Sequence, residues 1–236
     1  MMVTPASDET LDTFFKGRIR ILQKKRGYRF SIDAVLLSQF SKIRKKERVI
    51  DLGTGCGILP LLLSHQTKAH SFMGVEIQKD LAELAERNVV LNHLEDRISI
   101  LHYDFRKLKA LFPPECFDVV VSNPPYRKDR TGRVNPILEK AVARHEIHGT
   151  LEDLLSIASY LLPPKGRCYL IFPARRTVDL LVALRNQRLE PKRLRFVHAR
   201  LREEANFILT ESMKASGVEL KVMDPLILHG HESKTL

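Results

Sequence analysis

The stretch VIDLGTGCGIL, from Val49 to Leu59, sets three glycines between two apolar runs. The first run has the composition of a buried strand, and the second opens a helix that continues as ILPLLLSHQ. Glycines at such a junction let the backbone approach a ligand, and the helix N-terminus offers free N–H groups. The dinucleotide fingerprint G-x-G-x-x-G is not completed, because Ile58 stands where its third glycine belongs. Asp51 would also repel a pyrophosphate but not a cationic cofactor, which argues against NAD and FAD.

The sequence on either side of this junction alternates between strand-like and helical patterns. Strands are expected at residues 72–77, 98–104, 117–123 and 168–173, with helical stripes at 81–91 and 151–162. Such alternation predicts a parallel sheet with helices on both faces. The runs at 193–199 and 206–214 are joined too closely for a crossover helix and should pair antiparallel. Residues 1–45 are expected to form a small cap of strands and a helix from about Ser31, ahead of residues 46–236, within one structural domain overall.

Composition narrows the class of protein. The chain has 236 residues, of which 44% are hydrophobic, enough for one α/β domain with a core. It holds no apolar run long enough to span a bilayer, and its N-terminus is unlike a secretory signal, so a cytoplasmic location is expected. Cys56, Cys116 and Cys168 are interpreted as small buried hydrophobes. His145 and His148 miss the HExxH spacing by one residue, and no metal is expected.

The charge suggests a polyanionic partner. The formal net charge is +11 and the pI is near 9.7, a balance that favours nucleic acid. Basic residues gather at several places, including one group near the N-terminus and one directly after two prolines. The candidate nucleic-acid contacts are Lys24, Lys25, Arg26, Arg127, Lys128, Arg130 and Arg133.

Acidic residues follow the next two expected strands. Glu76 closes the second strand, where a carboxylate can accept hydrogen bonds from both hydroxyls of a ribose. Asp104, after the third strand, offers a carboxylate for an adenine amino group, and Phe105 offers a ring beside it. Because the carboxyl ends of parallel strands share one edge of the sheet, these residues predict a site for an adenosine-containing cofactor.

Three motifs carry a resemblance to class I S-adenosylmethionine-dependent methyltransferases: DLGTGCG, GVEI and YDF, within a region from about Tyr28 to Met213. The resemblance implies a Rossmann-like α/β fold with a seven-stranded, mostly parallel sheet and a C-terminal antiparallel hairpin. It also implies S-adenosyl-L-methionine as cofactor and S-adenosyl-L-homocysteine as product. By the same resemblance, the loop from Gly53 to Gly57 holds the methionine part, Glu76 the ribose, and Asp104 with Phe105 the adenine. The loop residues so implied are Asp51, Gly53, Thr54, Gly55 and Gly57.

The run NPPY, from Asn123 to Tyr126, resembles the fourth motif of the branch that methylates planar nitrogens. Such a nitrogen is a poor nucleophile, because its lone pair is delocalised. A side-chain oxygen of Asn123 and the carbonyl of Pro124 can accept its two hydrogens and draw it toward tetrahedral geometry. Pro124 and Pro125 fix φ and bring no competing N–H. Tyr126 can stack on the planar group and hold it in line with the methyl donor, and Asn123 also borders the cofactor.

The same motif occurs in enzymes that methylate adenine in DNA or RNA, or glutamine N5 in proteins. The positive charge favours RNA. The segments GYRFSIDAVLLSQF, SNPPY and ARHEIHGTLEDLL resemble the bacterial tRNA(Val) adenine-37 N6-methyltransferase family, which implies a tRNA substrate near the anticodon.

That second resemblance also bears on single residues. It implies cofactor contacts for Phe30 and Asp33, although core packing explains Phe30 equally well, and Arg144-His145-Glu146 matches a run whose role is more structural than catalytic. Three alternatives stay open: a protein-glutamine methyltransferase, another rRNA or DNA adenine methyltransferase, and an RNA-binding module without catalysis.

Overall fold

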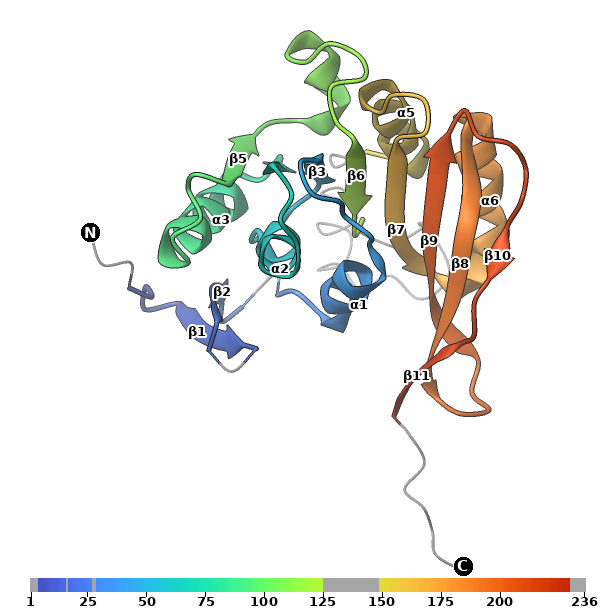
Figure 1. Cartoon of the computed structure of the whole chain (residues 1–236). Coiled ribbons are helices and arrows are strands. Elements are labelled where there is room, and N and C mark those ends of the chain that lie inside the picture. Colours follow the sequence, from blue (N-terminus) through green and yellow to red (C-terminus); the bar gives the residue numbers. More distant parts are fainter. Residues whose placement is uncertain (1–3, 16, 27–28, 125–148, 230–236) are drawn as a thin grey trace, which may run out of the picture.

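The computed structural model describes residues 4–15, 17–26, 29–124 and 149–229 (Figure 1). Its centre is a twisted sheet whose parallel strands follow the order β5-β4-β3-β6-β7. These strands are β3 (Arg48–Leu52), β4 (Ser71–Glu76), β5 (Ile98–His102), β6 (Val119–Ser122) and β7 (Arg167–Pro173). The helices between them include α2 (Ile58–Gln66), α3 (Lys79–Leu91) and α5 (Leu151–Leu161). Each was expected from the alternating pattern, and the α/β class is confirmed.

The sheet ends in an antiparallel hairpin, as predicted. β9 (Ala205–Lys214) lies between β7 and β8 (Leu189–Arg200) and is antiparallel to both. Two short strands, β10 (Lys221–Val222) and β11 (Leu226–His229), then run parallel to β8 and extend the predicted seven strands to nine. Three helical elements also lie outside the predicted pattern: η1 (Phe105–Ala110), η2 (Ala174–Arg176) and α6 (Thr177–Asn186).

The central strands β3, β6 and β7 are buried on both faces, which is why they are nearly continuous apolar runs. Val49 and Val121 point into a core with α2, α3 and α1 (Ile32–Phe40), whereas Ile50 and Leu52 point into a second core with α5 and α6. The alternation of faces along β3 therefore decides which of the two cores each side chain enters.

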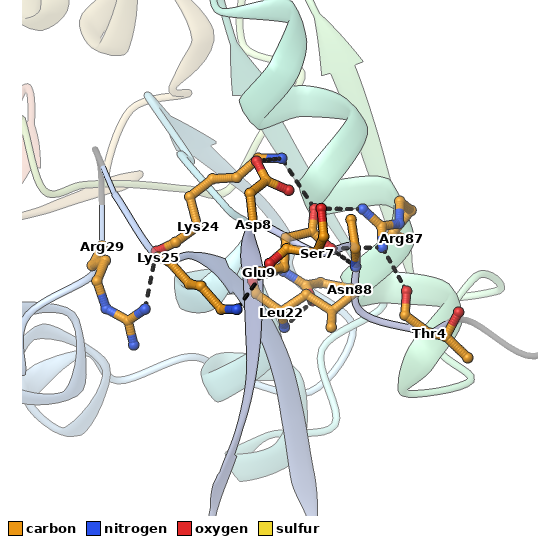
Figure 2. A network of polar contacts seen from close by, with 11 residues as sticks. Thr4, Ser7, Asp8, Glu9, Leu22, Lys24, Lys25, Arg29, Arg87 and Asn88 are labelled. Carbon is orange, nitrogen blue, oxygen red and sulfur yellow. Dashed lines mark hydrogen bonds and ion pairs between the residues drawn. The ribbon is translucent and has the colours of Figure 1, made fainter.

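The N-terminal segment forms its own two-stranded sheet, made of β1 (Glu9–Phe14) and β2 (Ile19–Lys24). Figure 2 shows this hairpin attached to α3 by polar contacts. Glu9 is buried, and Arg87 of α3 donates to its two carboxylate oxygens at 2.7 and 2.8 Å. These hydrogen bonds lower the pKa of Glu9 to about 2, although burial alone would raise it. The expected cap of strands followed by a helix is thus present, and its division from residues 46–236 stays a prediction.

Candidate active site

The polar residues at the carboxyl ends of neighbouring strands lie along one edge of the sheet. Register pairs Asp51 of β3 with Gly74 of β4 and Val121 of β6, so Glu76 and Asn123 follow at the same edge. The hydroxyl of Ser122 donates to the carbonyl of Leu52 at 2.6 Å in a buried contact. This bond ties the end of β6 to the end of β3 and brings Asn123 beside the glycine loop.

The glycine loop has a backbone that only glycine adopts without strain. Gly53, Gly55 and Gly57 have φ of 79°, 57° and 81°. The N–H groups of Gly53 and Thr54 both donate to the carbonyl of Val75 at 2.9 Å. A Cβ built on Gly53 would meet no described atom within 4 Å, so this side of the loop has room for a ligand.

Glu76 holds the loop in place. One carboxylate oxygen accepts the N–H of Gly55 at 2.9 Å, and the other accepts the N–H of Gln78 at 2.9 Å. Each carboxylate oxygen has two lone pairs, so each can accept one more hydrogen bond. Glu76 is buried yet oriented toward the loop, as a residue that receives two ribose hydroxyls would need to be.

Asp51 at the end of β3 and Thr54 within the loop are both buried. Among the described residues, Asp51 Oδ1 and Thr54 Oγ1 have no hydrogen-bond partner. Burial, and to a lesser degree the nearby Glu76, raises the pKa of Asp51 to about 7, while the Thr54 hydroxyl opposes this without reaching hydrogen-bond geometry. Gly74 makes room for Thr54, because a Cβ there would lie 2.8 Å from the threonine side chain. Buried atoms of this kind require a partner, and a cationic donor would satisfy them and favour the ionised carboxylate.

Asp104 has an additional role that the sequence reading did not include. It is the N-cap of η1, and Arg106 donates to it through its backbone N–H at 3.0 Å and its guanidinium at 2.8 to 3.0 Å. Burial alone would raise the pKa of Asp104, but the Arg106 hydrogen bonds lower it. The Asp104 carboxylate would therefore have to accept from an adenine amino group and from Arg106 at the same time. A Cβ on Gly149 would lie 2.8 Å from the ring of Phe105, so the start of α5 lies directly against that ring.

The two N-terminal candidates lie in packed positions. The ring of Phe30 lies 5.1 Å from that of Phe14, edge to face, and also packs against the core that contains α1 and α2. Asp33 is buried in the first turn of α1, and burial raises its pKa. For Phe30, the geometry supports the packing role that the sequence left open beside a cofactor contact.

The basic residues near the N-terminus are largely engaged within the cap. Lys24 lies opposite Glu9 in the hairpin and its amine contacts Asp8 at 3.0 Å and Glu9 at 3.2 Å. The amine of Lys25 donates to the carbonyl of Ser7 at 2.8 Å. Both amines thus have partners among residues 7–9, and the predicted phosphate contacts of Lys24 and Lys25 stay a prediction. Arg26 is exposed and stays a candidate.

Part of the predicted site falls on residues that the structure does not describe. Asn123 is half-buried and Pro124 is buried at the end of β6. Two residues of the NPPY motif lie outside the described residues, Pro125 and Tyr126. The same is true of the basic residues after the motif, Arg127, Lys128, Arg130 and Arg133, and of the run Arg144-His145-Glu146.

Three side chains that shape the site were not singled out from the sequence. Ser122 anchors β6, Arg106 pairs with Asp104, and Asn88 of α3 donates to the carbonyl of Cys56 in the glycine loop at 2.9 Å. Asn88 gave a usable signal, since a polar amide within a buried helical stripe must find partners.

The described residues show neither a membrane-spanning helix nor a cluster of metal ligands. No helix in that part of the chain has the length and apolar character needed to cross a bilayer. The same residues contain no group of three or more His, Cys, Asp or Glu side chains placed to hold a metal ion.

Comparison with known proteins gives matches over most of the chain. The profile of the methyltransferase small domain matches residues 32–162. The tRNA1(Val) (adenine(37)-N6)-methyltransferase of Porphyromonas gingivalis is 33% identical over 226 residues, which cover 92% of this chain and 88% of that protein. A protein of the same name from Tolumonas auensis is 31% identical over 173 residues, covering 73% and 70%. Among solved structures, a predicted O-methyltransferase from Agrobacterium tumefaciens has a TM-score of 0.69 at 25% identity, covering 86% of this chain and 90% of that one.

Proposed function

Because the chain belongs to the methyltransferase small domain family, we propose that it transfers a methyl group from S-adenosylmethionine to N6 of an adenine in tRNA, near the anticodon. The observation that carries the proposal is the gathering of Asp51, Glu76 and Asn123 at one edge of the sheet. We infer the substrate from relatives that share about a third of the residues of this chain, because their names specify adenine 37 of tRNA.

The residues at this edge have the chemistry that the cofactor requires. When bound, the cofactor supplies an electrophilic methyl group on a sulfonium and a cationic amino group. The unpartnered oxygens of Asp51 and Thr54 suit the cationic methionine part, beside the open side of Gly53. Glu76, held by two backbone N–H groups, retains lone pairs for the ribose hydroxyls. Asp104 and Phe105 lie beyond it at the end of the next strand, where the adenine is expected.

The end of β6 offers two hydrogen-bond acceptors to the target nitrogen. Asn123 brings a side-chain oxygen, and Pro124 brings a carbonyl with no N–H of its own to compete. Two acceptors at this point would take the two hydrogens of an exocyclic amine and localise its lone pair toward the methyl donor. Tyr126 would stack on the flat base and exclude water. Orientation and hydrogen bonding by these groups account for the rate, without a covalent intermediate on the chain.

RNA contacts are assigned to the exposed Arg26 and to the basic residues that follow the motif. Arg127, Lys128, Arg130 and Arg133 come directly after the target-binding residues in the sequence. Phosphate contacts of this kind position the RNA and make binding fall steeply with salt. A tRNA substrate also agrees with the cytoplasmic location predicted from the sequence.

The proposal is tested by labelled methyl transfer to bulk tRNA and, separately, to a peptide-release factor. We expect label in tRNA, recovered as N6-methyladenine at one nucleotide after digestion and mapping. Label in protein alone would support the glutamine alternative and overturn the proposal. Cofactor binding without label in either substrate would instead indicate a non-catalytic RNA-binding module.

The titration of Asp51 predicts a pH dependence for cofactor binding. Its pKa is about 7 in the free protein, and a cationic ligand favours the ionised form. Binding must therefore displace a proton below that pH, and the Kd for S-adenosylhomocysteine should rise about tenfold for each pH unit below 7. Above pH 7 the Kd should level off. Isothermal titration calorimetry between pH 5.5 and 8.5 measures this in the wild type and in Asp51→Asn.

The Asp51→Asn variant is the control for this titration. The amide does not ionise. The variant should therefore have a higher Kd for S-adenosylhomocysteine than the wild type at pH 8, and this Kd should be nearly independent of pH. A wild-type profile as flat as that of the variant would show that Asp51 does not face the cationic part of the cofactor.

A further inference from the structure

The outer edge of β2 is paired with two asparagine side chains, of Asn88 in α3 and of Asn92 at the C-cap of α3, in place of another strand. Asn88 accepts the N–H of Leu22 at 2.6 Å and donates to its carbonyl at 3.0 Å. Asn92 does the same for Arg20, at 2.9 and 2.6 Å. The match arises because side chains four residues apart on a helix share a face, and the backbone N–H and C=O groups of residues two apart on a strand point to the same edge. This asparagine ladder, Asn88 and Asn92, satisfies an edge that would otherwise be exposed.

Only Asn88 of the two extends the ladder to the glycine loop. Its side-chain nitrogen donates its second hydrogen to the carbonyl of Cys56 at 2.9 Å, and Asn88 is fully buried. The second hydrogen of Asn92 goes to the carbonyl of Asn88, within α3 itself. One amide thus contacts both the N-terminal hairpin and the loop, with both of its N–H hydrogens engaged.

A second contact shows that this face of α3 supports the loop closely. A Cβ on Gly57 would lie 3.1 Å from the Cβ of Ala85, which is three residues before Asn88 on the same face of the helix. The loop is therefore fixed on one side by Glu76, through Gly55, and on the other by α3, through Cys56 and Gly57. Three glycines with positive φ leave a loop that loses much conformational entropy when it becomes ordered, so each fixed point favours ligand binding.

The hairpin is also marginal by itself. Two strands without further partners are barely stable in water, so the hairpin depends on its docking, through the buried Ile21 and Leu22 as well as through the Glu9–Arg87 pair and the asparagine ladder. The hairpin and the glycine loop share one amide, so the position of either segment constrains that of the other.

We propose that Asn88 is a positioning residue that couples docking of the N-terminal hairpin to the geometry of the cofactor loop. Cofactor binding fixes the Cys56 carbonyl, which fixes the Asn88 amide and strengthens its bonds to Leu22. By reciprocity, loss of hairpin docking weakens cofactor binding by the same factor. The inference rests on the proposed function only in its choice of ligand.

Calorimetry with S-adenosylhomocysteine, which binds without reacting, compares Asn88→Ala with its matched control Asn92→Ala. Each variant loses three hydrogen bonds, two of them to β2, but only Asn88→Ala loses the contact with Cys56. We expect the Kd to rise about tenfold in Asn88→Ala and less than about threefold in Asn92→Ala. Equal weakening in both would overturn the special role of Asn88, because its contact with Cys56 would then add nothing to the loss of the two bonds to β2.

Hydrogen exchange of the Leu22 amide gives a measurement that needs no variant. Saturating S-adenosylhomocysteine should slow exchange of this amide at least about fivefold in the wild type, since its acceptor Asn88 becomes fixed. Unchanged exchange in the bound wild type would overturn the coupling even if Asn88→Ala failed to fold.

A double-mutant cycle with Glu9→Gln completes the test, because this variant weakens hairpin docking at a point remote from the loop. Glu9→Gln should weaken cofactor binding in the wild-type background and have little effect in the Asn88→Ala background. An equal effect in both backgrounds contradicts the coupling. If the wild type does not bind S-adenosylhomocysteine at all, the proposed function itself fails, and this inference fails with it.

Discussion

Asn123→Ala is expected to lower the rate of methyl transfer by about a hundredfold to a thousandfold, with a much smaller change in cofactor affinity. In the proposed mechanism, the variant lacks one of the two acceptors that would localise the lone pair of the target nitrogen, an interaction that would strengthen as the transition state forms. The backbone of residue 123 would stay in place, because the end of β6 is anchored by Ser122 through Leu52. Single-turnover rates at saturating tRNA, together with calorimetry for S-adenosylhomocysteine, separate the two effects.

Asn123→Asp is the matched control for that experiment. The carboxylate keeps the acceptor oxygens but adds a negative charge near the site, so activity should fall less than in Asn123→Ala. If Asn123→Ala retained more than about a third of the wild-type rate, the side-chain oxygen would not act on the target amine.

Glu76→Gln is expected to weaken binding of S-adenosylhomocysteine by about ten- to a hundredfold, despite its nearly identical shape. Both carboxylate oxygens of Glu76 accept backbone N–H groups, from Gly55 and from Gln78. Whichever way the new amide turns, its NH₂ group would meet one of these donors and leave it unpaired. The glycine loop would lose its fixed point at Gly55, and the ribose would lose an acceptor.

The control for Glu76→Gln is Glu83→Gln on α3, an acid that is exposed and paired with Lys79 only at 3.6 Å. We expect this variant to bind S-adenosylhomocysteine as the wild type does, because exposed pairs of this kind contribute little. An unchanged Kd in Glu76→Gln as well would mean that the ribose binds elsewhere.

The sequence predicted the parallel part of the sheet because buried strands leave a strong pattern. Short apolar runs with a polar residue at or near their carboxyl ends located β3, β4 and β6, and thus Asp51, Glu76 and Asn123. α6 left a weaker signal, since Val178 and Val182 are 73% and 54% exposed and obscure its apolar face. β10 and β11 are two and four residues long and are formed by pairing with β8, a tertiary effect with no local pattern.

The roles of individual charged residues were harder to predict. Lys24 and Lys25 belong to a basic cluster in the sequence, but the hairpin register sets Lys24 opposite Glu9 and uses both amines within the cap. Asp104 was expected to face an adenine, and its cap of η1 depends on Arg106 two residues later. Composition reports how much charge a chain carries, whereas these partners are decided by how the chain folds back on itself.

The asparagine ladder also bears on the order in which the protein assembles during synthesis. Its rungs join residues 66 and 72 positions apart, so the first two strands leave the ribosome long before the helix that receives them. At translation rates of about 5–20 residues per second, the hairpin waits on the order of several seconds for its partner. During that interval its unpaired edge is accessible to other nascent chains and to chaperones, until α3 emerges and covers it.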